Sequence, residues 1–159
     1  MTQTPTPTFI PLLNSVSRAE TTAGEAFTEW AQSTTDKRLA KTLRLVAMRE
    51  SEHGIAFAKR MLELNSEVYD DGLDFTAELR KVVASKRSDL SKMKALGFNK
   101  SNPSPDIFDK FFRDKTIDPT TGALLGRYIC EERDTGRLLK AEHDRLHAAE
   151  KKRKERANR

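Results

Sequence analysis

The sequence predicts an all-helical protein: a four-helix bundle with a short extra helix before a long C-terminal helix. Three observations support this prediction. Good helix formers dominate the composition, with 33% charged residues and only seven glycines among 159 residues. Apolar residues recur at intervals of three and four over several long segments, the spacing of one buried helical face. No alternation of apolar and polar residues is long enough to indicate a strand.

Length and charge set limits on the class of protein. A chain of 159 residues forms one domain. The net charge of +5 is concentrated in a basic tail at residues 151–159, so we expect no nucleic-acid partner. The single cysteine, Cys130, cannot form an internal disulfide, and no apolar run is long enough to span a membrane. These features favour a cytoplasmic location.

The N-terminal part of the domain is predicted as a helical hairpin. Residues 1–10 begin with a polar, proline-broken stretch and form a disordered lead-in to the bundle at residues 11–150. A first helix spans residues 11–32. Capping side chains at residues 33–36 then make a tight turn, and a second helix begins near Lys37. So short a turn requires the two helices to lie antiparallel.

Polar residues occupy three positions where these two helices bury apolar side chains. Glu50 and His53 lie in the apolar stripe of the second helix, and Glu20 lies in that of the first. The hairpin pairs residues whose numbers sum to about 70, so Glu20 faces Glu50 with His53 one turn away. An unpaired buried charge costs several kcal/mol, so these side chains need partners. Two interpretations stay open: they bind a metal ion, or they satisfy one another by hydrogen bonds as a structural polar cluster.

The remaining chain is predicted as a third helix, a short helix and a long last helix. A polar linker at residues 65–72 precedes the third helix, at residues 74–96. The short helix, at residues 106–113, closes one end of the bundle with its Ile and Phe side chains. The last helix begins near Thr120 and continues past Lys151, so at ~1.5 Å per residue it reaches roughly 50 Å. Its basic end must overhang the bundle or pack on a partner, which makes a homodimer reasonable.

Residues 17–61 resemble the ferritin-like family that includes rubrerythrins and bacterioferritins, four-helix bundles with a Glu on one helix and a Glu-x-x-His on the next. The matching residues are Glu20 and the run Glu50-Ser51-Glu52-His53. The resemblance implies a carboxylate-bridged pair of iron or manganese ions whose open coordination positions admit oxygen or peroxide. It therefore implies oxidase- or peroxidase-like chemistry, although the sequence assigns no catalytic residue.

The second half of the chain departs from the family pattern. The inner face of the third helix carries Phe75 and Lys86 but no Glu. The last helix has Glu132 on its inner face, with Asp134 or Thr135 where the family has a second His. The linker after the second helix reaches at most ~28 Å, too short for the family's crossover, so an up-down-up-down bundle stays open. The candidate metal ligands, enough for one ion or an asymmetric pair, are Glu20, Glu50, His53 and Glu132.

Two functions from different classes follow from these observations. The first is a non-haem iron or manganese protein with a site of one or two ions. The second is a non-catalytic helical module whose long basic C-terminal helix binds a partner. Two further signals are weaker. His143 and His147 lie four residues apart, a spacing that suits zinc or nickel, but we interpret them as an incidental exposed pair. Tyr128 is interpreted as a core tyrosine with a satisfied hydroxyl; the less favoured alternatives are a hydrogen bond to a ligand carboxylate and a role in redox chemistry.

Overall fold

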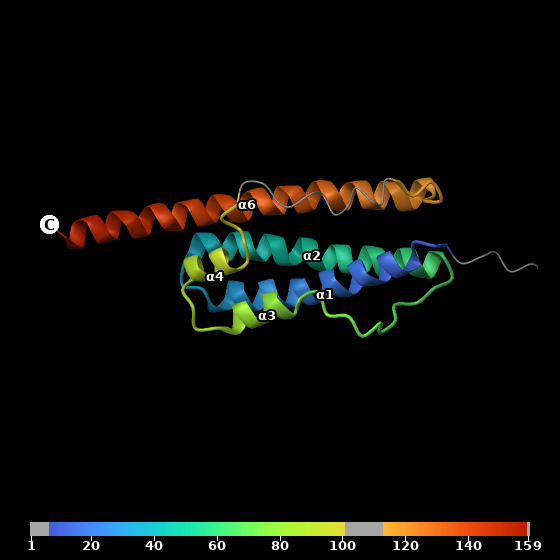
Figure 1. The fold of residues 1–159 in the computed structure, drawn as a ribbon, viewed down its shortest axis with the longest axis horizontal. Helices are drawn as coiled ribbons and strands as arrows, with labels where there is room; N and C mark the ends of the chain where they lie inside the picture. Colours follow the sequence, from blue (N-terminus) through green and yellow to red (C-terminus); the bar gives the residue numbers. More distant parts are fainter. Residues whose placement is uncertain (1–6, 101–112, 159) are drawn as a thin grey trace, which may run out of the picture.

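The structure is a computed structural model that describes residues 7–100 and 113–158. Within these ranges the chain forms five helices and no strand, so the all-α class is confirmed (Figure 1). The short helix predicted at residues 106–113 lies almost entirely outside them. Among the described residues, no helix combines the length and the apolar character needed to cross a membrane. The helices are α1 (Ile10–Ser33), α2 (Lys37–Glu63), α3 (Ala77–Ala84), α4 (Asp89–Ala95) and α6 (Pro119–Ala157).

Helices α1 and α2 form the antiparallel hairpin that the short turn predicts (Figure 1). The Asp36 side chain caps α2 by accepting a hydrogen bond from the Leu39 amide at 2.9 Å. This bond satisfies one of the backbone amides that a helix leaves free at its start. Phe9 and Ile10 are buried in the core, so the packed chain begins before the predicted domain boundary at residue 11.

Two glycines let α1 and α2 approach each other closely. A methyl group added at Gly24 would lie 2.4 Å from the Ser51 hydroxyl and 3.1 Å from the Ser51 backbone nitrogen. One added at Gly54 would lie 2.4 Å from the Thr21 hydroxyl and 3.0 Å from the Thr21 backbone nitrogen. The Ser17 hydroxyl donates a hydrogen bond to the Gly54 carbonyl at 2.9 Å. The two backbones are therefore in direct contact at the level of the predicted site.

We expect Gly54→Ala to lower the free energy of unfolding by about 1–2 kcal/mol, because the added methyl group forces the two backbones apart. Gly136→Ala is the matched control, since nothing lies within 4 Å of its added methyl group. That exchange should raise the free energy of unfolding by about 0.5–1 kcal/mol through helix propensity alone. Urea denaturation of both variants measures the difference. Equal stabilisation by the two exchanges would contradict the close approach at Gly54.

Helix α6 runs antiparallel to α2 (Figure 1). A ladder of ion pairs joins the two helices. Three arginines of α2 recur every eleven residues, about three helical turns, and so project from one face. Each arginine forms an ion pair with a different acidic residue, and these acidic residues are spread from the N-cap of α6 to beyond its middle. The last turns of α6 extend beyond the other helices, and residues 151–158 are exposed (Figure 1). The pairs are Arg38–Glu142 at 2.9 Å, Arg49–Asp134 at 2.8 Å and Arg60–Asp118 at 2.9 Å.

The prediction of one continuous third helix at residues 74–96 is wrong, because the chain forms the two short helices α3 and α4 there. Ser85 adopts an extended conformation that ends α3, and the Ser88 side chain accepts a hydrogen bond from the Ser91 amide, which starts a new helix. The buried Lys92 ammonium donates to the Val83 carbonyl at 2.7 Å and ties α4 back to α3.

The break changes which side chains face inward and how the short helices pack. Phe75, predicted on the inner face, is 66% exposed, and Lys86 is exposed as well. Helix α3 packs against α1, whereas α4 packs against α6. The described residues therefore hold three long helices and two short ones, rather than four long helices.

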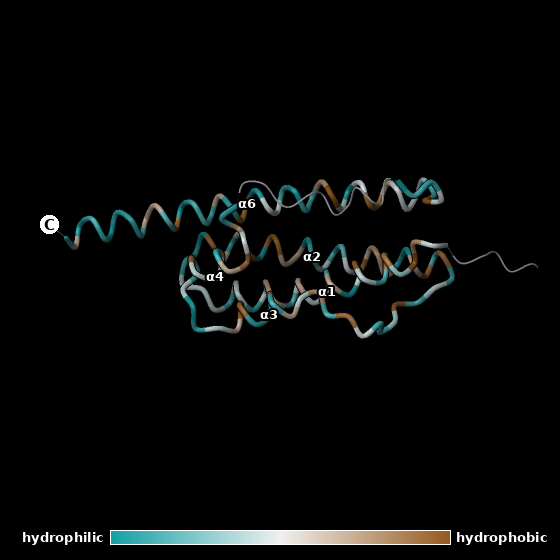
Figure 2. Tube along the Cα trace, viewed as in Figure 1, coloured by the Kyte–Doolittle hydropathy of each residue, from teal (hydrophilic) through white to brown (hydrophobic). Residues whose placement is uncertain are grey.

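The hydrophobic core has two parts, one toward each end of the long helices. The part near the α1–α2 turn contains Trp30 and Leu43, and the part at the other end contains Leu13 and Phe57. Hydrophobic residues are spread along the three long helices within the bundle, whereas the overhanging end of α6 is mostly hydrophilic (Figure 2). Between the two parts, each of the three long helices contributes buried or half-buried polar side chains.

Candidate metal centre

The four candidate ligands meet at the level between the two parts of the core. Glu20 comes from α1, Glu50 and His53 come from α2, and Glu132 comes from α6. Each offers one nitrogen or oxygen atom, and these atoms all lie within 4.8 Å of one another. Glu20, Glu50 and His53 are buried, and Glu132 is partly buried. The hairpin register and the inner stripe of α6 thus bring the predicted residues together.

His53 lies at the centre of this cluster and is held by a fifth residue. Its Nε2 atom lies 2.6 Å from Glu131 Oε2. An ionised carboxylate only accepts hydrogen bonds, so Nε2 carries the proton and donates it to Glu131. The other ring nitrogen, Nδ1, lies 3.5 Å from Glu20 Oε2 and 3.6 Å from Glu132 Oε1, too far for good hydrogen bonds.

The atoms that face one another across the cluster lack hydrogen-bond partners. Glu20 Oε2, His53 Nδ1 and Glu132 Oε1 are buried and unpaired. Such groups are costly to bury and are normally satisfied, so a cation between them would stabilise the arrangement. Protonation of Nδ1, which makes the His53 imidazole positively charged, is one way to supply this charge. Burial disfavours it, but Glu20 and Glu131 outweigh burial and raise the pKa of His53.

The three carboxyl groups of the cluster cannot all ionise without a cation among them. Burial, reinforced by the charges of Glu20 and Glu132, raises the pKa of Glu50 to about 11. Burial and the charge of Glu20 raise the pKa of Glu132 to about 7. Burial also opposes ionisation of Glu20, but the nearby His53, Glu50 and Tyr128 outweigh it and lower the pKa of that carboxyl. The metal-free cluster therefore keeps a proton on Glu50 at neutral pH.

Tyr128 supports the cluster from α6. Its hydroxyl donates a hydrogen bond to Glu20 Oε1 at 2.7 Å, which leaves Oε2 facing His53. The Tyr128 ring also meets the His53 ring edge to face, with the two ring centroids 4.9 Å apart. Burial and the nearby carboxylates raise the pKa of Tyr128, so its hydroxyl stays a donor. The structure thus shows the less favoured alternative, a hydrogen bond from Tyr128 to a candidate ligand.

The Arg49 guanidinium lies beside Thr135, the position where the family resemblance implies a second histidine. Thr135 follows Glu132 by three residues, as His53 follows Glu50. The Arg49 guanidinium lies 3.4 Å from the Thr135 hydroxyl and forms an ion pair with Asp134 at 2.8 Å. The positive charge of Arg49 favours the ionised form of Glu132, but burial has the larger effect, so the pKa of Glu132 is raised overall. The side of the cluster next to Thr135 therefore carries the positive charge of Arg49.

Glu131 and Arg49 are the functional residues that sequence reasoning missed. The periodicity of the last helix puts Glu131 beside the inner stripe rather than on it, and Arg49 lies outside the apolar stripe of the second helix. A signal for both existed, because Glu131 directly precedes Glu132 and Arg49 directly precedes Glu50. A residue next to a candidate ligand lies near the cluster, and α2 and α6 face each other there.

The remaining candidates lie away from this cluster. The interpretation of His143 as exposed is wrong, because it is buried, whereas His147 is exposed. The two imidazole rings are stacked with centroids 5.9 Å apart, and His143 Nδ1 lies 3.0 Å from Asp144 Oδ1. Cys130 is exposed and reduced.

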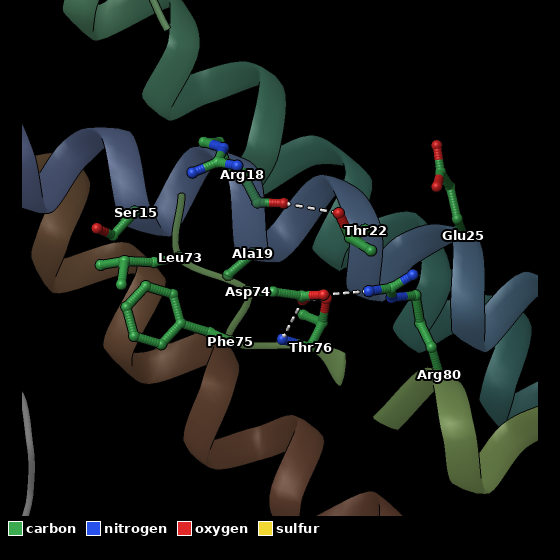
Figure 3. A pocket seen from close by; sticks show the side chains of 10 residues that line it. All are labelled: Ser15, Arg18, Ala19, Thr22, Glu25, Leu73, Asp74, Phe75, Thr76 and Arg80. Atoms are coloured by element: carbon green, nitrogen blue, oxygen red, sulfur yellow. Dashed lines mark hydrogen bonds and ion pairs between the residues drawn. The ribbon is translucent and has the colours of Figure 1, made fainter. Parts of the chain in front are cut away.

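A surface pocket of about 370 Å³ lies between α1 and the chain leading into α3 (Figure 3). Arg80 on one side of it pairs with Asp74, and Arg18 on the other pairs with Asp70 at 2.7 Å. Both guanidinium groups are therefore already neutralised within the chain. None of the four candidate ligands lines this pocket.

Comparisons with known proteins add no family to this description. No protein family model matches the chain, and neither the curated proteins nor the solved structures include one that is significantly similar to it. The function must therefore be inferred from the chemistry of the cluster.

Proposed function

We propose that this protein is a ferritin-like, non-haem metal-binding protein that binds one iron or manganese ion through Glu20, Glu50, His53 and Glu132. The observation that carries the proposal is the set of buried, unpartnered atoms around which these residues gather. Three carboxylates and one imidazole form a hard, anionic ligand set. Iron and manganese suit such a set better than softer metals, which prefer thiolates.

Residues that hydrogen-bond the candidate ligands support the same assignment. A metal-ligating imidazole usually donates its other N–H to a carboxylate, which fixes the tautomer and orients the ring. Glu131 accepts that hydrogen bond from His53 at 2.6 Å and leaves Nδ1 free toward the carboxylates. Tyr128 orients Glu20 in a similar way, because its hydroxyl donates a hydrogen bond to one of the two carboxylate oxygens.

A single ion is favoured over the pair that the family resemblance implies. Thr135 offers a hydroxyl where a second imidazole would be required. The Arg49 guanidinium beside it repels another cation and already balances part of the negative charge. A bound iron or manganese ion would supply the capacity to react with oxygen or peroxide, while the chain positions the ligands and limits access of water.

Metal analysis of the untagged protein tests the proposal. Anaerobic titration with Fe(II), and separately with Mn(II), should end at one ion per chain. His53→Ala should abolish this binding while circular dichroism stays unchanged, and His147→Ala, a change at an exposed imidazole, should bind as the wild type does. Protein that takes up neither ion, or equal uptake by His53→Ala, would show that the cluster is a structural polar core.

We expect Glu131→Ala to weaken metal binding by about 10- to 100-fold, because the His53 ring loses the acceptor that orients it. Arg127→Ala is the matched control. Arg127 donates to the outer side of Glu131 at 2.9 Å and is largely exposed, so its loss leaves the bond to His53 in place. Competition with a chromogenic chelator measures both dissociation constants. A similar loss in the two variants would contradict the orienting role of Glu131.

A further inference from the structure

The outward face of α2 carries a row of exposed apolar side chains. Leu45, Met48, Ile55 and Leu62 are 43%, 65%, 70% and 60% exposed. Glu52 and Lys59 lie in the same row. With them included, successive members are separated by three and four residues in turn. We call this row the α2 outer stripe; its members are Leu45, Met48, Glu52, Ile55, Lys59 and Leu62.

The stripe is separate from the contacts that α2 makes within the chain. Ser51 and Gly54 face α1. Arg49 and Arg60 face α6, where they pair with Asp134 and Asp118. The stripe lies opposite the buried face that contains Phe57 and Met61, so neither α1 nor α6 covers it. An apolar repeat of three and four residues on one exposed face is the seam by which two helices pack together.

The two charged members of the stripe make it complementary to itself. Glu52 and Lys59 lie at equal distances on either side of the midpoint between Ile55 and Ala56. If a second copy of α2 packs antiparallel about a two-fold axis at this midpoint, Glu52 of each copy faces Lys59 of the other. Ile55 then packs beside its own symmetry mate.

The apolar ends of the stripe fit the same arrangement. Met48 and Leu62 lie at nearly equal distances from Ile55, so each meets the other across the axis. From Leu45 to Leu62 the stripe is about 26 Å long, enough for several turns of contact. A two-fold interface of this kind requires each patch to match itself, and the pair Glu52 and Lys59 and the pair Met48 and Leu62 do so.

Within the chain, the two charges have only weak, exposed partners. Glu52 lies 3.7 Å from Arg127, and Lys59 lies 3.6 Å from Glu63, with most of each side chain in solvent. Exposed pairs of this kind contribute little to stability, so both charges are available to a partner.

We infer that the α2 outer stripe is the interface of a homodimer in which two copies of α2 pack antiparallel, with the two-fold axis beside Ile55, at the midpoint between Ile55 and Ala56. The occupant is a second copy of this chain, because opposite charges and apolar residues are placed symmetrically about one point of one helix. The inference is independent of metal binding, since no candidate ligand belongs to the stripe.

Sedimentation of the full chain over a range of concentrations tests this inference. The wild type should be a dimer, and Ile55→Glu should raise its dissociation constant by about 100-fold or more, because it places two like charges at the axis. Phe75→Glu is the control, since this equally exposed aromatic residue lies outside the stripe and its exchange should leave the dimer intact.

Charge exchange gives the decisive result. Glu52→Lys and Lys59→Glu should each weaken the dimer, whereas the double variant should restore it, since each new pair again has opposite charges. A monomeric wild type would overturn the inference. So would a dimer that is insensitive to Ile55→Glu, or a double variant no better than the single ones, because the stripe would then be covered by another part of the chain or by another protein.

Discussion

In Glu50→Gln, we expect metal affinity to fall by about 100-fold or more while the metal-free protein becomes more stable. Affinity falls because a ligand carboxylate is replaced by a weakly coordinating amide. Stability rises because Glu50 is buried among carboxylates, and its pKa rises from 4.5 in the unfolded chain to about 11 in the folded one. The folded state therefore binds more protons than the unfolded state between these pH values, and the wild type loses stability as pH rises through this window.

The slope of that loss for one group is at most about 1.4 kcal/mol per pH unit. Glutamine cannot ionise, so the advantage of the variant should grow from pH 5 to pH 8. Urea denaturation in the presence of a chelator measures it. Glu29→Gln, at an exposed position of α1, is the control and should change neither property. An advantage that does not depend on pH would contradict the assignment of the proton to Glu50.

The double variant Arg49→Ala, Thr135→His should bind two metal ions per chain where the wild type binds one. The new histidine completes a second Glu-x-x-His on α6. Removal of the Arg49 guanidinium takes away a positive charge that would repel a second metal ion. The carboxylates of Glu20, Glu50 and Glu132 are then shared between both ions, as the ligand atoms already lie within 4.8 Å of one another.

The single variants separate the two contributions. Thr135→His alone should still bind one ion, because the Arg49 charge remains beside it. Arg49→Ala alone should also bind one, because no imidazole is added. Metal content after gel filtration measures all three. If the double variant binds only one ion, Arg49 does not replace a second metal; if the wild type binds two, the proposal of a single ion is wrong.

Much of the hairpin was predictable from the sequence, because its signals are local. Apolar periodicity and a short capped turn are enough to place Glu20, Glu50 and His53 at one level. The inner position of Glu132 followed from periodicity in the same way. These are the residues whose ligand atoms the structure brings together.

The remaining features depend on contacts between distant segments. The break between α3 and α4 is accompanied by contacts of Lys92, whose ammonium lies over the Trp30 ring and donates to the Val83 carbonyl. Spacing alone did not reveal it, although Ser85 and Ser88 are helix-ending and helix-capping residues. The contact between His53 and Glu131 depends on the rotation of α6 about its axis, which the pattern of one helix fixes only approximately. His143 was misplaced for the same reason.

Because ion pairs join α6 to α2, we expect α6 to open before the hairpin of α1 and α2 does. Helices α1 and α2 are joined by close backbone contact, whereas α6 depends partly on paired charges that salt screens. Segments held in this way exchange their amide protons through local opening, well before the whole domain unfolds. A metal ion ligated from α1, α2 and α6 would have to be released before α6 could open. If the site binds a metal ion as proposed, slow amide exchange along α6 would report metal occupancy, and fast exchange there would mark the empty protein.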